Sequence, residues 1–382
     1  MRIRSLATIA EVSAEAWDAL VPGRDPFLAH AFLSALERHG CVGRGTGWLP
    51  CPLVCEGSDG RLLGACPLYF KLNSYGEFVF DGSWAEAYRR HGLPYYPKLV
   101  AAVPYTPATG RRLLVARDAD AAAVAGALIE GARELARDSG SSSVHWLFPT
   151  TEEMGWLRSA GAASRLGCQF HWHNPGYRDF DDFLATLSAK KRKNIRQERR
   201  RVQEAGIELE CLAGDAVDAG QWRTFHAFYC STFRRLGGQP TLTLPFFTAV
   251  GRALGERVLL VLAHAGARTV GAAISFASDT TLYGRHWGCA DSVDALHFEA
   301  CYYQGIEHCI RRGLTRFEPG AQGEHKVSRG FLPTLTHSAH WIAHPGFRQA
   351  IDDFLHRETP AVEDYARELH EHSPYRRAGG ES

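Results

Sequence analysis

The segment 283–326 constrains the fold most strongly, because it combines three predicted elements with a dense group of polar side chains. Residues 283–287 alternate bulky and polar side chains, which predicts a strand. Residues 295–312 repeat apolar side chains at helical spacing and are followed by Gly313, a residue typical of helix ends. Residues 315–318 predict a second strand. A strand–helix–strand segment of this kind forms two parallel strands joined by a right-handed crossover.

This crossover predicts where a functional site lies. The carboxyl ends of both strands meet at one edge of the sheet, where α/β folds bind ligands. We therefore expect His286 and Glu318 to lie near each other. The loop that follows adds the polar residues Gln322, Glu324, His325 and Lys326. The alternative interpretation is that these are ordinary loop residues and one strand histidine.

The length and composition indicate a soluble protein of two domains. A chain of 382 residues favours two domains, which we predict at residues 1–175 and 176–382. Contents of 45% hydrophobic and 22% charged residues are ordinary for a globular protein, and the net charge of +1 excludes function through bulk electrostatic attraction. The sequence shows no signal-peptide pattern and no apolar run of about 18 residues that could span a bilayer. We expect a cytoplasmic protein, and peripheral contact with the inner membrane stays open.

A short internal match indicates that the chain repeats one α/β unit. Residues 61–70, RLLGACPLYF, resemble residues 268–276, RTVGAAISF. In each half the match is followed by a strand, a long helix and a strand that ends in proline, at Pro149 and Pro319. We predict an α/β fold of two similar halves, each with a mixed twisted sheet flanked by helices.

A strongly basic helix is predicted at residues 188–204, at the junction of the two halves. Its candidate anion- or donor-binding residues are Lys190, Lys191, Arg192, Lys193 and Arg196. Charge runs of this kind are usually solvated helix faces. In a chain of nearly neutral net charge, however, a local cluster favours binding of a phosphorylated carrier, an RNA backbone or an anionic membrane surface.

An irregular aromatic region is predicted at residues 78–105. Its density of tyrosine, tryptophan and proline is typical of a packed lid or of the wall of an apolar substrate channel. The candidate substrate-binding residues here and just beyond are Asp81, Trp84, Tyr105 and Thr106.

The cysteines and histidines do not predict a metal site. Ten cysteines are scattered along the chain, and no pair has the two-residue spacing of a zinc or redox motif. His171 and His173 flank Trp172, but two residues on one strand face do not make a metal site. We predict reduced, mostly buried cysteines and no metal.

Several segments together resemble a known family. They are PYTPATGRRLL (104–114), SAKKRKNIRQERRR (188–201), HFEACYYQGIEHCI (297–310), GAQGEHK (320–326) and RGFLPTLTHSAHWI (329–342). The chain resembles, over nearly its whole length, bacterial N-acyltransferases grouped with the FemAB-like peptidoglycan-bridge enzymes of the GNAT superfamily. The resemblance implies tandem GNAT-like acyltransferase domains.

N-acylation assigns roles to the residues of the crossover. A free alkyl amine has a pKa of about 10, so a base must take its proton before it attacks a carbonyl. His286 fits this role, with Glu318 as its orienting partner or as the base itself. Lys326 or Arg285 could stabilise the oxyanion, together with backbone N–H groups of a splayed strand, which GNAT folds use. The further candidate substrate-binding residues are Tyr283 and Tyr303, either of which could protonate the leaving group, and Glu299.

Three functions remain open from the sequence. The first is an N-acyltransferase with acyl-CoA as co-substrate and a lipid amine, such as a sphingoid base, as acceptor. The loop 288–294 does not favour ordinary acetyl-CoA, because it has one glycine and two acids where pyrophosphate-binding loops are glycine-rich. The second is the FemAB-like reaction, in which aminoacyl-tRNA donates an amino acid to a peptide or muropeptide. The third is a non-catalytic binding module.

Overall fold

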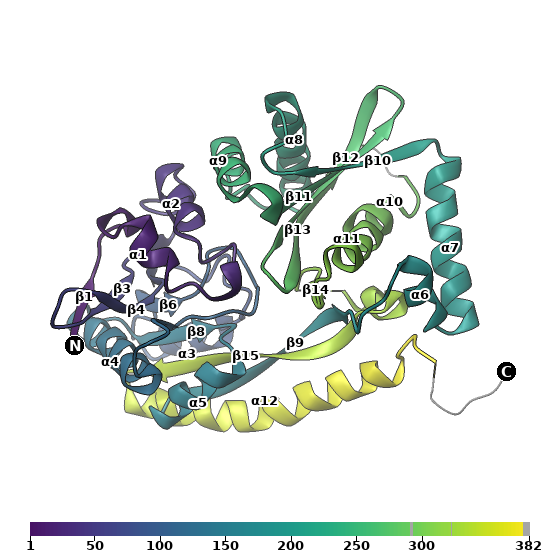
Figure 1. The fold of residues 1–382 in the computed structure, drawn as a ribbon. Coiled ribbons are helices and arrows are strands. Elements are labelled where there is room, and N and C mark those ends of the chain that lie inside the picture. Colours follow the sequence, from purple (N-terminus) through teal and green to yellow (C-terminus); the bar gives the residue numbers. More distant parts are fainter. Residues whose placement is uncertain (291–292, 322, 377–382) are drawn as a thin grey trace. The chain divides into compact units, whose positions relative to one another are not determined.

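The computed structural model describes residues 1–290, 293–321 and 323–376 and divides the chain into two compact units (Figure 1). Unit 1 comprises residues 1–168 and 335–364, and unit 2 comprises residues 169–334 and the chain from residue 365 onward. The sequence predicted one boundary, at residue 175, and assigned residues 335–364 to the second domain. The structure places them in unit 1, because Ser338–Ile342 pair antiparallel with a strand of that unit.

Unit 1 contains two groups of strands. The first, in the order β1-β3-β4-β7, comprises β1 (Arg2–Ser5), β3 (Leu53–Glu56), β4 (Leu62–Cys66) and β7 (Leu114–Val115). The second, in the order β15-β8-β6-β5-β2, comprises β2 (Trp48–Pro50), β5 (Leu68–Lys71), β6 (Lys98–Ala101), β8 (Ser143–Leu147) and β15 (Leu332–Ile342). Its helices are α1 (Ala14–Asp18), α2 (His30–Arg38), α3 (Gly82–Arg90), α4 (Ala121–Asp138) and α5 (Thr151–Ser159). The strands β6 and β8 are parallel, and α4 lies between them in the chain.

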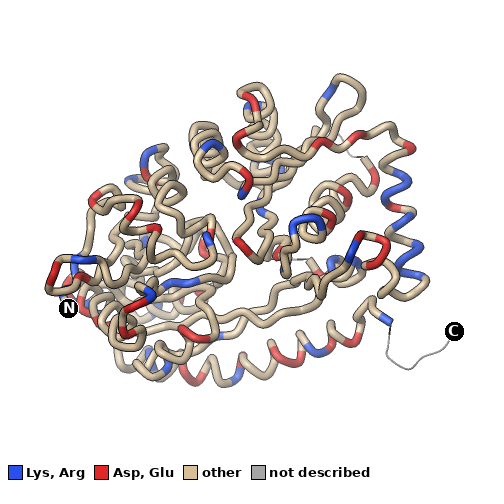
Figure 2. The backbone as a smooth tube through the Cα atoms, in the orientation of Figure 1, with Lys and Arg blue, Asp and Glu red and all other residues tan. Residues whose placement is uncertain are grey.

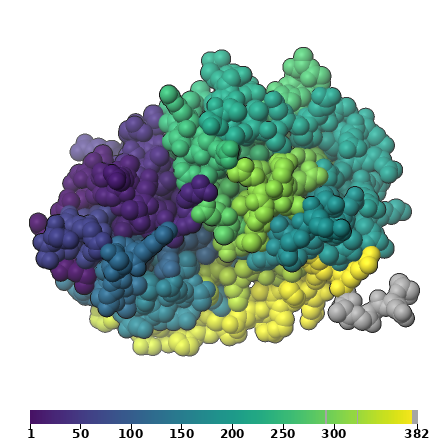
Figure 3. Space-filling view, viewed as in Figure 1, coloured from purple at the N-terminus to yellow at the C-terminus, as the bar shows by residue number. Residues whose placement is uncertain are grey.

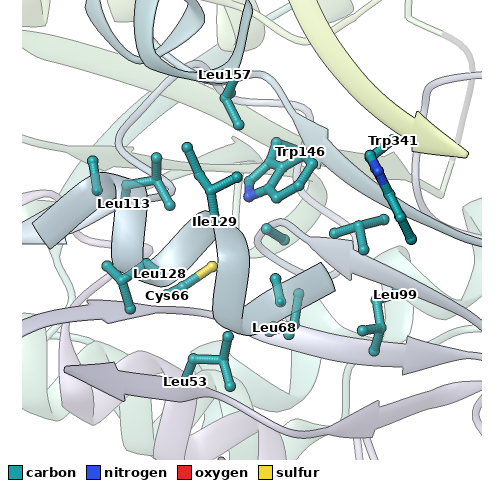
Figure 4. Close-up of a cluster of buried hydrophobic side chains, with 14 of the residues drawn as sticks. Leu53, Cys66, Leu68, Leu99, Leu113, Leu128, Ile129, Trp146, Leu157 and Trp341 are labelled. Carbon is teal, nitrogen blue, oxygen red and sulfur yellow. The ribbon is translucent and has the colours of Figure 1, made fainter. Parts of the chain in front are cut away.

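The core of unit 1 forms where α4 packs on these strands. Asp120 caps the first turn of α4, because its carboxylate accepts a hydrogen bond from the Ala123 N–H at 3.1 Å. The buried face of the helix carries Leu128 and Ile129, which pack with Leu68 and other strand residues (Figure 4). The long helix that the sequence predicted in this half thus forms and buries one apolar face against the strands.

Unit 2 is built on one mixed sheet. Its strands, in the order β10-β11-β12-β13-β14-β9, are β9 (Ala163–His173), β10 (Ile207–Ala213), β11 (Val258–Ala265), β12 (Arg268–Ala277), β13 (Thr281–Cys289) and β14 (Arg316–Glu318). Its helices are α6 (Phe180–Ala185), α7 (Ala189–Glu204), α8 (Ala219–Arg235), α9 (Leu244–Leu254), α10 (Leu296–Phe298) and α11 (Gln304–Arg312), with a π-helical turn at Glu299–Tyr303 and a 3₁₀ helix at Glu324–Arg329. The strands β13 and β14 are parallel, as the sequence predicted, and the helical segment 296–312 connects them.

The predicted fold class is confirmed: the chain is a mixed α/β protein of two units, in which helices flank mixed sheets. Three local predictions are wrong. The aromatic region contains the regular elements α3 and β6. The pattern of residues 329–342 predicted two strands with an intervening turn, whereas the structure has one strand, because the turn-forming Gly330 and Pro333 lie before and at its start.

The third wrong prediction concerns the C-terminal helices. The sequence predicted two helices, at residues 345–356 and 360–372, separated before Pro360. The structure has one helix, α12 (Pro345–Glu371), which lies at the surface in the space-filling view (Figure 3). Pro360 is exposed, so water can solvate the carbonyl group that the proline leaves without a donor. Among the helices that the structure describes, none is long and apolar enough to cross a membrane.

Candidate active site

A cavity of about 120 Å³ lies in unit 2 where β13 extends past the end of β14. The two strands are paired from Thr281 with Arg316 to Tyr283 with Glu318, and β14 ends there. Beyond Tyr283, β13 remains paired with β12 only. The residues that line the cavity are Ala273, Ile274, Ser275, Gly284, Arg285, His286, Trp287, His297, Cys301, Tyr302 and Pro319. The site therefore lies at the carboxyl end of the parallel pair, as the crossover predicted.

A β-bulge shapes the wall of this cavity. On β12, Ile274 pairs with His286 and Ser275 pairs with Gly284, so Arg285 is an extra residue on β13. A bulge bends its strand and re-aims the side chains next to it. Gly284 suits this point, because a Cβ atom would lie 3.2 Å from the Cα atom of Pro319, which is tighter than an ordinary contact.

His286 is partly accessible in the cavity and is surrounded by aromatic rings. Its imidazole centroid lies 4.8 Å from that of Tyr229, 6.1 Å from that of Phe247 and 6.4 Å from that of Phe233. Burial, with a smaller contribution from the nearby Arg285, lowers the pKa of His286 well below its ordinary value of 6.5. The imidazole is therefore neutral at pH 7 and has a nitrogen lone pair that can accept a proton.

Glu318 is buried and forms an ion pair with Arg316, with a distance of 3.0 Å between Nε and Oε1. No hydrogen bond joins Glu318 to His286 within the residues that the structure describes. Pro319, which follows Glu318, lines the same cavity as His286. The crossover thus brings the two chain segments to one site, but it does not produce the directly bonded dyad that we expected.

Lys326 is a buried cation whose hydrogen-bond partner, Gly320, follows the cavity-lining Pro319. It belongs to the 3₁₀ helix 324–329 and is only 3% exposed, and its Nζ atom donates a hydrogen bond to the carbonyl oxygen of Gly320 at 2.8 Å. Burial lowers the pKa of Lys326 to about 8. A lysine with such a pKa can exchange a proton near neutral pH, which is what acid–base catalysis requires.

Four other predicted residues lie on β13 or the following helix. Arg285 lines the cavity, and burial lowers its pKa to about 10. Tyr283 is buried and is the strand partner of Glu318. Glu299 accepts hydrogen bonds from Arg199 at 3.0 and 3.1 Å. The fourth, Tyr303, is fully buried and donates to Glu198.

The polar loop is only partly assembled at the cavity. The Tyr302 hydroxyl, which lines the cavity, lies 2.9 Å from Nε2 of His325. Glu324 instead accepts a hydrogen bond from the Tyr365 hydroxyl at 2.8 Å. Gln322, also predicted for the site, lies outside the described residues.

The four predicted residues of the aromatic region belong to unit 1, and each is buried there. Asp81 accepts hydrogen bonds from Lys98 and from the Tyr95 hydroxyl. Trp84 packs on His145 and His340. Tyr105 donates to the Cys41 carbonyl at 2.9 Å, and Thr106 donates to the Pro104 carbonyl at 3.0 Å. Within unit 1 these contacts stabilise the fold, and their predicted role in substrate binding stays a prediction.

The basic helix α7 carries lysine and arginine residues along most of its length (Figure 2). Two of its arginines bind carboxylates of unit 2: Arg199 binds Glu299 and Glu307, and Arg201 binds Asp294 at 2.9 Å. Three other cations, Lys190, Lys193 and Arg200, are exposed and make no ion pair with any described residue. Their spacing of three and seven residues places them on one side of the helix. Of the other predicted cations of α7, Lys191 also has no described ion pair, Arg192 donates to the Leu187 carbonyl and Arg196 pairs with Asp181.

Sequence reasoning missed four side chains that line the cavity, namely Trp287, His297, Cys301 and Tyr302. His297 and Cys301 are four residues apart on the helical segment, so they share one face. That spacing is visible in the sequence, but a histidine and a cysteine on one helix face more often belong to a core than to a site. Burial lowers the pKa of His297 to about 4.

Two predictions about cofactors, the absence of a metal and the doubt about acyl-CoA, can be compared with the described residues. In the described ranges, no group of three or more histidine, cysteine, aspartate or glutamate side chains could hold a metal ion. Of the two carboxylates expected to repel a pyrophosphate, Asp294 is neutralised by Arg201, and Asp291 lies outside the described residues. Asp294 alone is therefore a weaker argument against acyl-CoA than the sequence suggested.

Comparisons with known proteins place the chain in a family. The FemAB-like family, described as peptidoglycan biosynthesis/recognition, matches residues 8–377. No curated protein matches significantly. Among solved structures, FemX is 13% identical with a TM-score of 0.56, covering 92% of this chain and 100% of its own.

Two further structures share the fold. The C-terminal domain of a protein named as a lysylphosphatidylglycerol synthetase from Agrobacterium fabrum is 9% identical with a TM-score of 0.54, covering 91% of this chain and 97% of its own. The L-PGS of Bacillus licheniformis is 12% identical with a TM-score of 0.50, covering 85% of this chain and 96% of its own. The family match covers nearly the whole length of the chain, and the chain therefore belongs to the FemAB-like family.

Proposed function

We propose that this protein is an aminoacyltransferase that moves an amino acid from an aminoacyl-tRNA to an amine of a peptidoglycan precursor. The family description, peptidoglycan biosynthesis/recognition, supports the acceptor class. The fold shared with FemX and with the lysylphosphatidylglycerol synthetase domain supports a reaction that carries aminoacyl groups.

The observation that carries the proposal is the free cationic face of α7. Lys190, Lys193 and Arg200 are exposed and have no carboxylate partner among the described residues. A row of such cations favours a polyanion, because each phosphate contact releases a bound counterion. A CoA molecule offers few phosphates, whereas an RNA backbone offers one at every nucleotide. The α7 face therefore favours RNA as the donor carrier.

The reaction exchanges an ester bond for an amide bond. The acceptor amine attacks the ester carbonyl, and the bond to the ribose oxygen then breaks. His286, held neutral by burial, can accept the proton that the amine loses. Lys326 in its ammonium form can stabilise the oxyanion and return a proton to the ribose oxygen, because its pKa is about 8. Arg285 adds a second positive charge at the cavity wall.

Acylation of a lipid amine by acyl-CoA is the second candidate. The lining of the cavity by Trp287, Cys301 and Tyr302 favours it, since these side chains suit an apolar acyl chain. Its donor has no long phosphate backbone, so its binding should depend little on the α7 face.

A binding experiment separates the two donors. Lys190→Gln, Lys193→Gln and Arg200→Gln are combined in one variant, and Arg38→Gln, Arg117→Gln and Arg357→Gln, all exposed in unit 1, form a control of equal charge. We expect the first variant to bind aminoacyl-tRNA at least tenfold more weakly, with a salt dependence shallower by about two ions. Equal tRNA affinity in both variants, or binding of acyl-CoA but not of tRNA, would contradict the proposal.

A further inference from the structure

The loop 72–80 of unit 1 exposes a cluster of large apolar side chains. Leu72 is 50% exposed, Tyr75 49%, Phe78 41% and Phe80 72%. Among the described residues nine large apolar side chains are exposed, and these four fall within nine residues of sequence, whereas the others are scattered. Single exposed apolar residues are ordinary, but four of them within one short loop suggest an interaction site.

Hydrogen bonds to other residues of unit 1 hold the loop in this conformation. Lys71 donates to the Tyr75 carbonyl at 3.1 Å, and the Ser74 hydroxyl lies 2.7 Å from the Tyr96 hydroxyl. Glu77 points inward and accepts a hydrogen bond from the buried Lys98 at 2.8 Å. The polar groups of the loop are thus used inside unit 1, and the apolar groups remain outside.

The charges around the loop fit an anionic surface. Glu77 in the loop and Asp81 just after it are 4% and 2% exposed, so neither carboxylate offers negative charge to a partner. The Leu72 N–H donates to the Gly47 carbonyl at 3.2 Å, and the turn that ends at Gly47 carries the exposed Arg44. Aromatic side chains beside a cation are typical of protein segments that lie in the headgroup region of a membrane.

We propose that the loop 72–80 docks unit 1 on the headgroup region of an anionic lipid bilayer. A stable protein interface takes about 20–30 residues on each side, far more than this loop presents. A bilayer needs only a few inserted side chains and a favourable charge. The inference is independent of the proposed function, because it rests on unit 1 alone.

Vesicle binding tests the proposal. The full-length protein is sedimented with vesicles of phosphatidylglycerol and phosphatidylethanolamine, and with vesicles of phosphatidylcholine alone. The test variant combines Phe78→Asn with Phe80→Ser. Phe78 has a left-handed backbone, with a φ of 60°, which asparagine adopts readily, so the loop keeps its shape. The control combines Leu236→Ser with Leu335→Ser, two exposed apolar residues elsewhere.

We expect the native protein and the control to bind the anionic vesicles and the test variant to bind them at least tenfold more weakly. In a Phe80→Trp variant, brominated lipids should quench the added fluorescence, which shows that this side chain enters the bilayer. Failure of the native protein to bind anionic vesicles overturns the proposal. Equal binding by the test variant, or an equal loss in the control, also overturns it. If the loop serves a protein partner instead, the native protein would fail to bind the anionic vesicles.

Discussion

The Nζ atom of Lys326 lies 2.8 Å from the carbonyl oxygen of Gly320, one residue beyond the cavity-lining Pro319. This hydrogen bond holds a buried ammonium group beside the strand end where the parallel pair opens. Burial without a described carboxylate partner lowers the pKa of Lys326 to about 8. The lysine therefore connects the fold of the crossover with a group that can exchange a proton.

Lys326→Met should abolish most of the transfer activity while stabilising the fold at neutral pH. The folded state lowers the pKa from 10.5 to about 8, so below pH 8 it holds a charge that the unfolded chain solvates better. The native protein should thus gain stability as pH rises from 8 to 10.5, by at most about 3 kcal/mol. Urea unfolding measures the free energy of unfolding of both proteins at pH 7 and pH 10. If the difference in this free energy between the two proteins is the same at both pH values, the pKa of Lys326 is not lowered in the folded state.

His286→Gln should lower the turnover rate by about 10²-fold with little change in stability. General-base catalysis contributes roughly this amount, and the amide of glutamine cannot accept the proton of the amine. Steady-state kinetics with the same acceptor measures the effect. Tyr229→Phe, which keeps the ring next to the imidazole, is the control. Full activity of His286→Gln would remove this residue from the mechanism.

Arg199→Met should destabilise the protein by about 3 kcal/mol, because it leaves the buried carboxylate of Glu299 without its cation. Arg196→Met on the same helix is the matched control, since its ion pair with Asp181 is exposed and should contribute less than about 1 kcal/mol. Denaturant unfolding compares the two. Adding Glu299→Gln to Arg199→Met should restore part of the loss, and equal destabilisation by both single changes would contradict the assignment.

The buried histidines of unit 1 should make stability fall in acid. His145 and His340 are joined Nδ1 to Nδ1 at 2.6 Å, and burial lowers the pKa of His145 to about 3 and that of His340 well below 6.5. The unfolded chain binds these protons first, so stability present above pH 6.5 is lost as pH falls, by about 1.4 kcal/mol per pH unit for each histidine. His145→Asn with His340→Asn should flatten the dependence measured between pH 7 and 4. The surface change His356→Asn should not.

The sequence predicted local features well and long-range ones poorly. The crossover of residues 283–318 follows from apolar spacing and a helix-ending glycine, both readable within one segment. The burial of Lys326 was not readable, because it depends on the fold of the 3₁₀ helix, where Arg329 binds Glu198, 131 residues earlier in the chain. The prediction for Glu318 also failed. The sequence predicted His286 as its partner, whereas the structure pairs Glu318 with Arg316, two residues earlier on the same strand.

Helix α3 shows a second limit. Residues 82–90 begin with glycine and serine and carry two large aromatic residues, all weak helix formers, so their pattern does not predict a helix. The helix forms because Trp84 and Tyr88 pack into a cluster with Tyr95, Phe347 and Ile351. Tertiary packing therefore decided this element.

Transfer of a labelled amino acid tests the central claim most directly. The purified protein is incubated with tRNA carrying a radiolabelled amino acid and with a peptidoglycan precursor peptide that contains a free amine. We predict that label moves from the tRNA to the peptide as an amide, and that Lys326→Met lowers this transfer at least 10²-fold. Label that stays on the tRNA, while acyl-CoA releases free thiol in the presence of an amine, would contradict the account.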